Sequence, residues 1–211
     1  AAGDVAGAMV EANPDGAADM AATIAETVPN VAGIVAGAIA ETDPGLAAEA
    51  ASAMMEANPA TATQAAAGVA NAAPEVAGDV AGAMMEVAMD PAFSEDFAAS
   101  VAEANPDAAT EIATEMAAVA ANNENFSQDE ALAMQTAIAS QVASAAPEAA
   151  AEVAGAMVDA MVGVDGNASG ADIAEAAAAM TANVAAAATQ ANPEQAADLA
   201  GEMTEQMAEI P

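Results

Sequence analysis

Proline recurs in this chain at an interval of fifteen residues. Five prolines keep this interval in succession, at 14, 29, 44, 59 and 74. Others follow at 91 and 106, and then at wider intervals at 147, 193 and 211. Inside a helix, proline removes a backbone hydrogen bond and its ring clashes with the preceding turn, at a cost of about 3 kcal/mol. Each helix of this chain therefore has to fit between two prolines, which predicts an array of short units.

Apolar residues recur within these units when each proline is counted as position zero. Position three is alanine in nearly every unit. Position six holds Met20, Val35, Val80, Phe97, Ile112, Val153 and Leu199, with Ala50 and Ala65 as small exceptions. Position ten holds Ile24, Ile39, Met54, Val69, Met84, Val101, Met116, Met157 and Met203. Spacings of three, four and seven residues place these side chains on one helical face, so each unit is predicted to be an amphipathic helix.

The residue before proline is often Asn or Asp, as at 13, 43, 58, 90, 105 and 192. This pair predicts an N-cap followed by proline at the first helical position. The same proline disfavours helical geometry at the residue before it, so one dipeptide ends a helix and starts the next. Two further helix starts are expected without this pair. One is at residues 93–96, and the other is at Ser127, where Glu130 completes a capping box and Phe126 a hydrophobic staple.

The fold expected from these signals is all-α, namely an alanine-rich αα-solenoid of short amphipathic helices with a 15-residue repeat. Helices of about 12 residues are marginal in isolation and bury their apolar face only by stacking on their neighbours. About twelve helices are expected, in a single domain. Residues 1–121 would form the regular repeats, and residues 122–211 would continue the array with longer helices and two loop interruptions. The segment AGDVAGAM, present at 2–9 and again at 77–84, supports the repeat.

The charge excludes several classes of function. The chain has no Lys, Arg, His or Cys and carries 33 carboxylates, for a formal charge of −33. Nucleic-acid binding depends on Lys and Arg, so it is not expected. Without these residues and histidine there is also no ordinary means to activate a nucleophile or clamp a phosphate, so we expect no enzyme, no catalytic residue and no cofactor site. A hydrophobic content of 56% argues against disorder. No membrane insertion is expected, because the longest uncharged stretches are rich in Ala, Thr, Gln and Asn.

Two acidic features could bind calcium. Asp165, Asn167 and Ser169, followed by Gly170, match the first half of an EF-hand-type loop, but Glu175 stands one residue before the twelfth position. The alternative is a glycine-rich connection in which Ser169 or Gly170 caps the next helix. Carboxylates also recur at position twelve, where they would either face the N-terminus of the next helix or gather divalent cations. They are Glu26, Glu41, Glu56, Glu86, Glu103, Asp159 and Glu205.

The first helix carries no polar capping pattern, and its apolar stripe equals those of the internal units. Solenoids need such caps to stay soluble, and an open end that meets the opposite end of another molecule propagates into a fibre. We therefore expect a self-assembling structural subunit of an extracellular or cell-surface filament or layer, exported with removal of a signal peptide and stacked head to tail on copies of itself. The alternative is an acidic module that binds calcium, other divalent cations or mineral. Crowded carboxylates are expected to repel one another and so to raise their pKa values.

Overall fold

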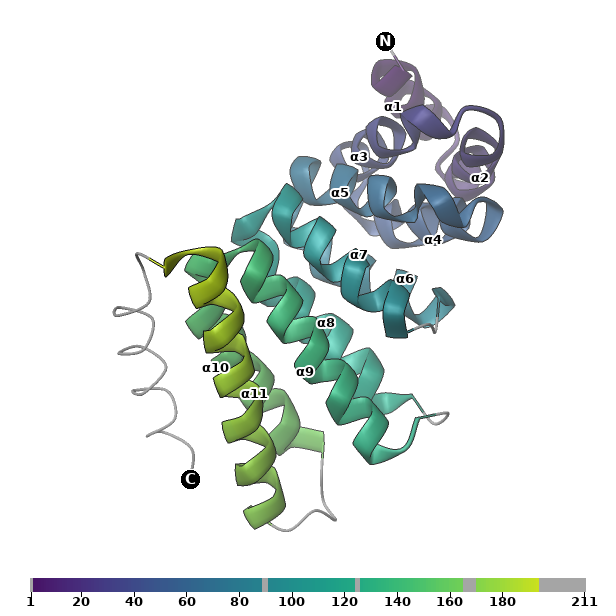
Figure 1. The fold of residues 1–211 in the computed structure, drawn as a ribbon. Coiled ribbons are helices and arrows are strands. Elements are labelled where there is room, and N and C mark those ends of the chain that lie inside the picture. Colours follow the sequence, from purple (N-terminus) through teal and green to yellow (C-terminus); the bar gives the residue numbers. More distant parts are fainter. Residues whose placement is uncertain (1, 89–90, 124–125, 165–169, 194–211) are drawn as a thin grey trace. The chain divides into compact units, whose positions relative to one another are not determined.

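The structure, a computed structural model, describes residues 2–88, 91–123, 126–164 and 170–193. Within these ranges there are eleven α-helices and no strand, which confirms an all-α repeat fold (Figure 1). The twelfth expected helix falls after residue 193, outside the described residues. No helix in these ranges combines the length and apolar character needed to cross a lipid bilayer. The chain divides into two compact units, residues 1–90 and 91–211.

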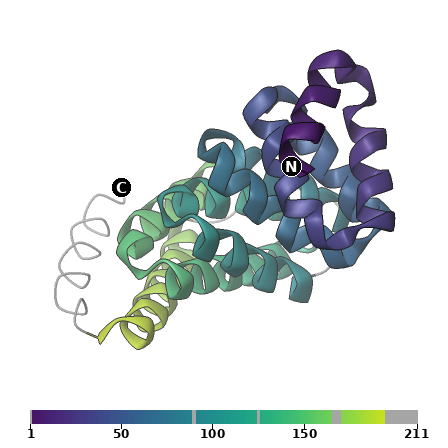
Figure 2. The same ribbon diagram turned by 90° about the horizontal axis from the view of Figure 1, so that it is seen from above.

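The first unit is a stack of two helical layers. It contains α1 (Ala2–Ala12), α2 (Ala17–Thr27), α3 (Ala32–Thr42), α4 (Ala47–Ala57), α5 (Ala62–Ala72) and α6 (Ala77–Ala88). Each helix packs most extensively on the helix two steps along the chain, so α1, α3 and α5 form one layer and α2, α4 and α6 form the other (Figures 1 and 2). From α2 onward, consecutive helices of this unit contact each other across the two layers. This arrangement is the predicted αα-solenoid.

The second unit repeats the two-layer scheme with longer helices. It contains α7 (Pro91–Ala104), α8 (Ala109–Asn122), α9 (Gln128–Ala145), α10 (Ala150–Val164) and α11 (Gly170–Ala191). Helices α7, α9 and α11 form one layer, and α8 packs on α10 in the other. The longer α9 also contacts both α8 and α10.

The turns between the regular helices follow one design. A single linking residue is followed by a three-residue 3-10 turn that begins at proline, as in Pro44–Leu46, and the α-helix starts on the next residue. The side-chain oxygen of the residue before proline accepts the backbone N–H two residues later at Asp43, Asn58 and Asn105, over 3.1, 3.2 and 3.1 Å. Three of the predicted caps are thereby confirmed, whereas Asn13 makes no such bond and Asp90 lies outside the described residues.

Two side-chain amides donate hydrogen bonds to carbonyl groups of other helices. Asn58 Nδ2 donates to the carbonyl oxygen of Ala25 at the end of α2, 2.9 Å away. In the second unit, the buried Gln135 Nε2 of α9 donates to the carbonyl oxygen of Ala117 in α8 over 3.1 Å. Each bond satisfies a carbonyl group and fixes the register of two helices.

The predicted apolar stripe is the core. From α3 onward, the described residues at positions six and ten are no more than 1% exposed. Position seven is also buried, and it is alanine in every described unit that follows a proline: Ala21, Ala36, Ala51, Ala66, Ala81, Ala98, Ala113 and Ala154. Such small side chains allow helix axes to approach toward the lower end of the 8–10 Å range.

Glycine brings the backbones of α3 and α5 into direct contact. A Cβ atom placed on Gly33 would lie 2.5 Å from the carbonyl oxygen of Gln64, and one on Gly37 would lie 2.8 Å from the carbonyl oxygen of Gly68. A Cβ atom on Gly68 would in turn clash with the backbone of Gly33. Only glycine fits at this crossing, because backbone atoms cannot move aside as a flexible side chain can.

The expected helix start at residues 93–96 is wrong. Helix α7 begins at Pro91, and Ser94 lies within it as a buried residue at position three. The proline register accounts for this, because proline at the first helical position starts the helix and the same register places Phe97, 1% exposed, at position six.

The helix start at Ser127 is confirmed. Glu130 donates its backbone N–H to Ser127 Oγ over 3.3 Å, and Ser127 donates its own N–H to Glu130 Oε2 over 2.9 Å. The Ser127 hydroxyl also donates to Glu130 Oε2, 2.6 Å away. These hydrogen bonds from the hydroxyl and the backbone lower the pKa of Glu130 from its ordinary value. The pKa of Glu130 is thus lowered, whereas repulsion between crowded carboxylates was expected to raise it.

Replacing Gly68 by alanine should destabilise the protein by about 1–3 kcal/mol, because the new methyl group meets the Gly33 backbone. Alanine normally stabilises a helix interior by about 1 kcal/mol relative to glycine, so a loss of stability in G68A would itself indicate the close backbone contact. The control is Gly3→Ala, whose methyl group would lie at an ordinary 3.4 Å from Ile34 Cγ2. Thermal unfolding followed by circular dichroism should show a lower midpoint for G68A alone, and equal midpoints for both variants would contradict this packing.

Replacing Glu130 by glutamine should lower stability at neutral pH and have less effect in acid. Because the folded pKa is lowered, the ionised carboxylate stabilises the helix above the ordinary value of 4.5, and this contribution is lost as pH falls through the folded pKa. The difference in melting temperature between the parent and E130Q should therefore shrink below that value. Glu103→Gln, at an exposed carboxylate near the end of α7, is the control. An E130Q effect that stays constant from pH 7 to pH 3 would exclude this linkage.

Candidate functional site

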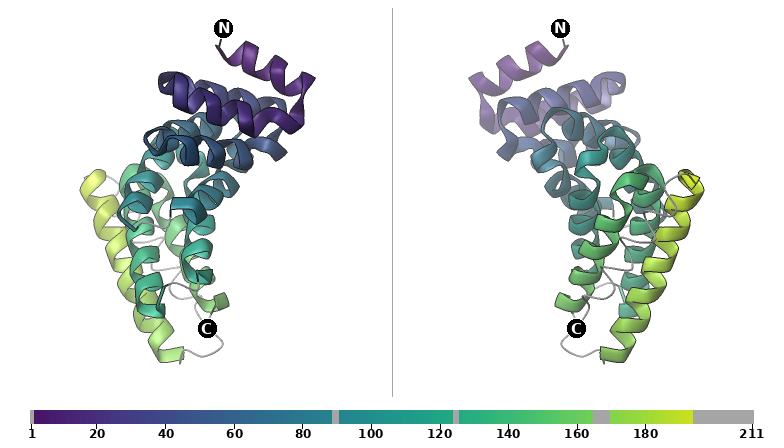
Figure 3. Two further views of the ribbon diagram at one scale, coloured as in Figure 1. Left: turned by 90° about the vertical axis from the view of Figure 1, so that its right-hand side faces the viewer. Right: turned by 90° about the vertical axis from the view of Figure 1, so that its left-hand side faces the viewer.

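The apolar stripe is uncovered at the first helix of the stack. Val5 and Met9, which occupy positions six and ten of α1, are 60% and 49% exposed. Met20 and Ile24, at the same positions of α2, are half-buried. At α3 the stripe is closed, since Val35 and Ile39 are 1% and 0% exposed. We call Val5, Met9, Met20 and Ile24 the open end, and α1 is the outermost helix of the first unit (Figure 3).

The same octapeptide is buried elsewhere in the chain. Helix α6 begins with AGDVAGAM, as α1 does, yet Val80 and Met84 of α6 are 1% and 0% exposed. Helix α6 has α4 and α5 packed against it, whereas the described residues leave Val5 and Met9 of α1 exposed. The same residues are thus buried or exposed according to the helices packed on them, so the exposure of Val5 and Met9 does not come from a sequence adapted to water.

The opposite side of α1 is closed by α3. Ala6 and Val10, at positions seven and eleven, are 2% and 1% exposed. A Cβ atom placed on Gly3 would lie 3.4 Å from Ile34 Cγ2, and one on Gly7 would lie 3.0 Å from Thr42 Oγ1. Helix α1 thus turns its small residues toward α3 and leaves the face of positions six and ten without a partner.

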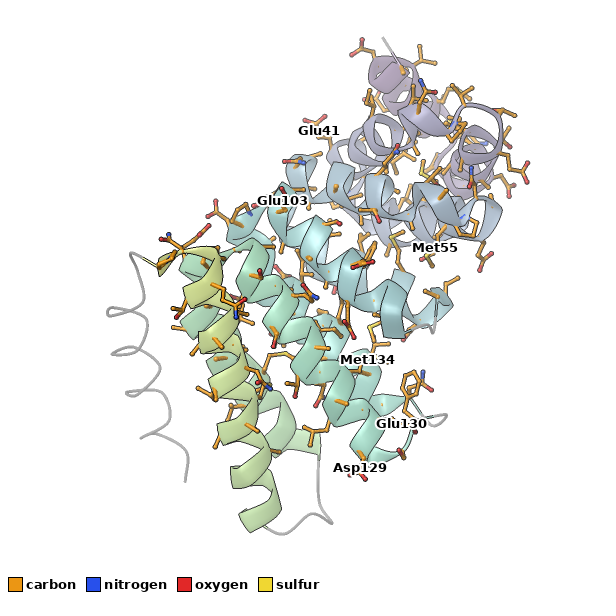
Figure 4. All side chains as sticks on the ribbon, in the orientation of Figure 1. Glu41, Met55, Glu103, Asp129, Glu130 and Met134 are labelled. Carbon is orange, nitrogen blue, oxygen red and sulfur yellow. The ribbon has the colours of Figure 1, made fainter. Side chains whose placement is uncertain are left out.

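An open groove of about 700 Å³ runs along the outer side of α1, α3 and α5. Its floor is made of glycine and alanine, and Ile34, 58% exposed, lies within it. Three carboxylates line it, from Asp4, Glu11 and Glu41, and the Glu41 side chain points away from the helix (Figure 4). The chain holds no side-chain cation that could pair with them. The groove is therefore a negatively charged surface beside the open end.

The position-twelve carboxylates lie on the surface where they are described. Glu26, Glu41, Glu56, Glu86 and Glu103 are all exposed. Within the described ranges, no group of three or more carboxylates lies close enough together to hold a metal ion. Glu205 lies outside these ranges, and the side chain of Asp159 in α10 is likewise not described.

The predicted calcium loop falls on residues that the structure does not describe. Asp165, Asn167 and Ser169 lie in the gap between α10 and α11. Glu175 lies in α11, but its side chain is outside the description as well. The loop remains a prediction from the sequence.

The bare apolar stripe of the first helix was predicted from the sequence, but the close packing of the helices through their small residues was not. The exposures of Val5 and Met9 confirm that the stripe of the first helix is bare. The contacts of positions four and eight were missed, although a signal was present in glycines four residues apart. These pairs are Gly3 and Gly7, Gly33 and Gly37, and Gly78 and Gly82.

Comparisons with models of protein families, with curated proteins and with solved structures found no match. The function therefore has to be inferred from the chemistry of the chain, and the open end is its most distinctive exposed surface.

Proposed function

We propose that the protein is a structural subunit that assembles when a second copy of the chain covers the open end. The observation that carries this proposal is the graded exposure of one stripe, from 60% at Val5 to 1% at Val35. A solenoid repeat contacts only its neighbours, and a terminal repeat with a bare apolar face needs a cap or a partner. The residues of the open end are apolar like those of the core, but they are partly or largely exposed to solvent.

A second copy is the partner that the chemistry of the chain favours. From α3 onward, the helices of the first unit bury this stripe against other helices of the same repeat, so the chain already contains surfaces of the required shape. The open end and the opposite end of a stack are different surfaces, and a contact between them is heterologous. Such contacts extend into filaments or layers when the rotation between copies does not close a ring.

The charge sets the conditions for assembly. Two molecules that each carry a formal charge of −33 and no side-chain cation repel one another. Screening reduces this repulsion over a Debye length of about 8 Å at physiological ionic strength. Salt or divalent cations should therefore promote assembly. A filament or layer outside the cell is the setting that we propose.

Replacing Val5 by glutamate should weaken assembly at least tenfold. Completing the burial of a half-exposed valine contributes about 1 kcal/mol, and about 1.4 kcal/mol corresponds to a factor of ten in the dissociation constant. A buried carboxylate without a partner adds to the loss. Sedimentation velocity over a range of concentrations, with negative-stain microscopy of the product, would measure the effect in low salt, high salt and calcium.

Val87→Glu is the matched control for this experiment. Val87 is 40% exposed on α6, outside the open end, and its replacement changes the net charge by the same amount. The parent and V87E should form regular assemblies at similar concentrations. A parent that stays monomeric at high concentration in salt and calcium, or a V5E variant that assembles as V87E does, would refute the proposal.

A further inference from the structure

Methionine is the one readily oxidised side chain of this sequence. The sequence has fourteen methionines and no Cys, Trp, Tyr or His. Oxidation adds one oxygen atom to the thioether sulfur and converts a flexible apolar side chain into a polar one. A mild oxidant that meets the folded protein should therefore react at a methionine.

Met9 is the most exposed of the methionines whose burial the structure describes. It is 49% exposed, and Met20 is half-buried. The others in this described set are buried, namely Met54, Met55, Met84, Met85, Met116, Met134, Met157 and Met180. Because an oxidant has to reach the sulfur atom, Met9 should react before all of these.

The duplicated octapeptide isolates the effect of burial on this reaction. Met9 and Met84 each end a copy of AGDVAGAM, and both copies lie in α-helices. Met84 is nevertheless fully buried, because α4 and α5 pack on α6. The seven residues before each sulfur are the same, so a difference in reactivity between the two would come mainly from packing.

We propose that Met9 is a site of reversible oxidation by hydrogen peroxide, and that its sulfoxide prevents a second copy from covering the open end. The second part rests on the proposed function and adds its regulation. The sulfur lone pair attacks one peroxide oxygen, so an S–O bond forms as the O–O bond breaks, and after proton transfer the other oxygen leaves as water. The sulfur loses two electrons and the peroxide gains them. Because hydrogen peroxide is uncharged at neutral pH, the formal charge of −33 does not repel it.

Oxidation of Met9 opposes assembly because a sulfoxide oxygen accepts hydrogen bonds. The open end consists of Val5, Met9, Met20 and Ile24, whose side chains offer no hydrogen-bond donor. A covering helix would remove water from the sulfoxide without replacing its hydrogen bonds, and an unpaired buried polar group is costly. The same cover would shield the unoxidised sulfur of an assembled subunit. Methionine sulfoxide reductases reverse the reaction, with one enzyme for each epimer of the sulfoxide.

The first experiment measures where hydrogen peroxide reacts. Dilute protein in low salt is treated with peroxide, cleaved with a glutamate-specific protease and sequenced by tandem mass spectrometry. Met9 should be oxidised faster than Met84 by on the order of tenfold in the folded protein, and at a similar rate in denaturant, where burial is lost. Equal rates at the two residues in the folded protein would overturn the assignment of Met9.

The second experiment measures assembly by sedimentation velocity before and after peroxide treatment. The oxidised parent should require a concentration higher by on the order of tenfold to assemble, and reduction by the two sulfoxide reductases should restore the original value. Met9→Leu keeps an apolar side chain that peroxide does not attack, so this variant should assemble equally well before and after treatment. Met20→Leu, at position six of α2, is the matched control and should stay as sensitive as the parent.

Met9→Gln makes the same position polar without any oxidant, and this variant should assemble as poorly as the oxidised parent. Normal assembly of M9Q or of the oxidised parent would overturn the regulatory role of Met9, as would an M9L variant that remains sensitive to peroxide. A parent that never assembles would refute the proposed function and its regulation together. The relative oxidation rates of Met9 and Met84 would still decide whether Met9 is the modification site.

Discussion

The whole structure depends on the close approach of helices two steps apart, made possible by residues with almost no side chain. Where Gly33, Gly37 and Gly68 meet, backbone lies against backbone, and the described alanines at position seven are also buried. Dispersion contacts are individually small, but they add up along every helix of a densely packed stack. Because the helices are only eleven residues long in the regular units, this lateral packing, rather than helix length, keeps them folded.

The charged side chains contribute to the stability of this fold in an unusual way. With no Lys, Arg or His, the chain has no side-chain ion pairs to contribute to its stability. None of the carboxylates whose exposure is described is buried. Polar groups stabilise the fold locally instead, through caps such as Asp43 and through amide bonds such as that from Asn58 to Ala25. The result is a core made of short apolar side chains inside a shell of uniform negative charge.

Much of this fold could be predicted because one residue type, proline, marks every regular boundary. Its spacing identified the helices, and the residues at positions six and ten identified the core. The start of α7 was misassigned because Ser94 and Glu95 imitate a capping signal, while Pro91 and the buried Phe97 decide the register. The backbone contacts of glycine were not predicted, because the glycines four residues apart that signal them are equally consistent with a flexible position. The open end could be predicted because an amphipathic helix without a neighbour is visible in the pattern, whereas its degree of exposure required coordinates.

The duplicated octapeptide has a consequence for what determines the residues of a unit. Helices α1 and α6 begin with identical residues although they stand five units apart, an odd number, and so belong to opposite layers. This octapeptide is therefore accepted in a helix of either layer. At these eight positions the residues are set by their place in the fifteen-residue unit rather than by the layer that the helix joins.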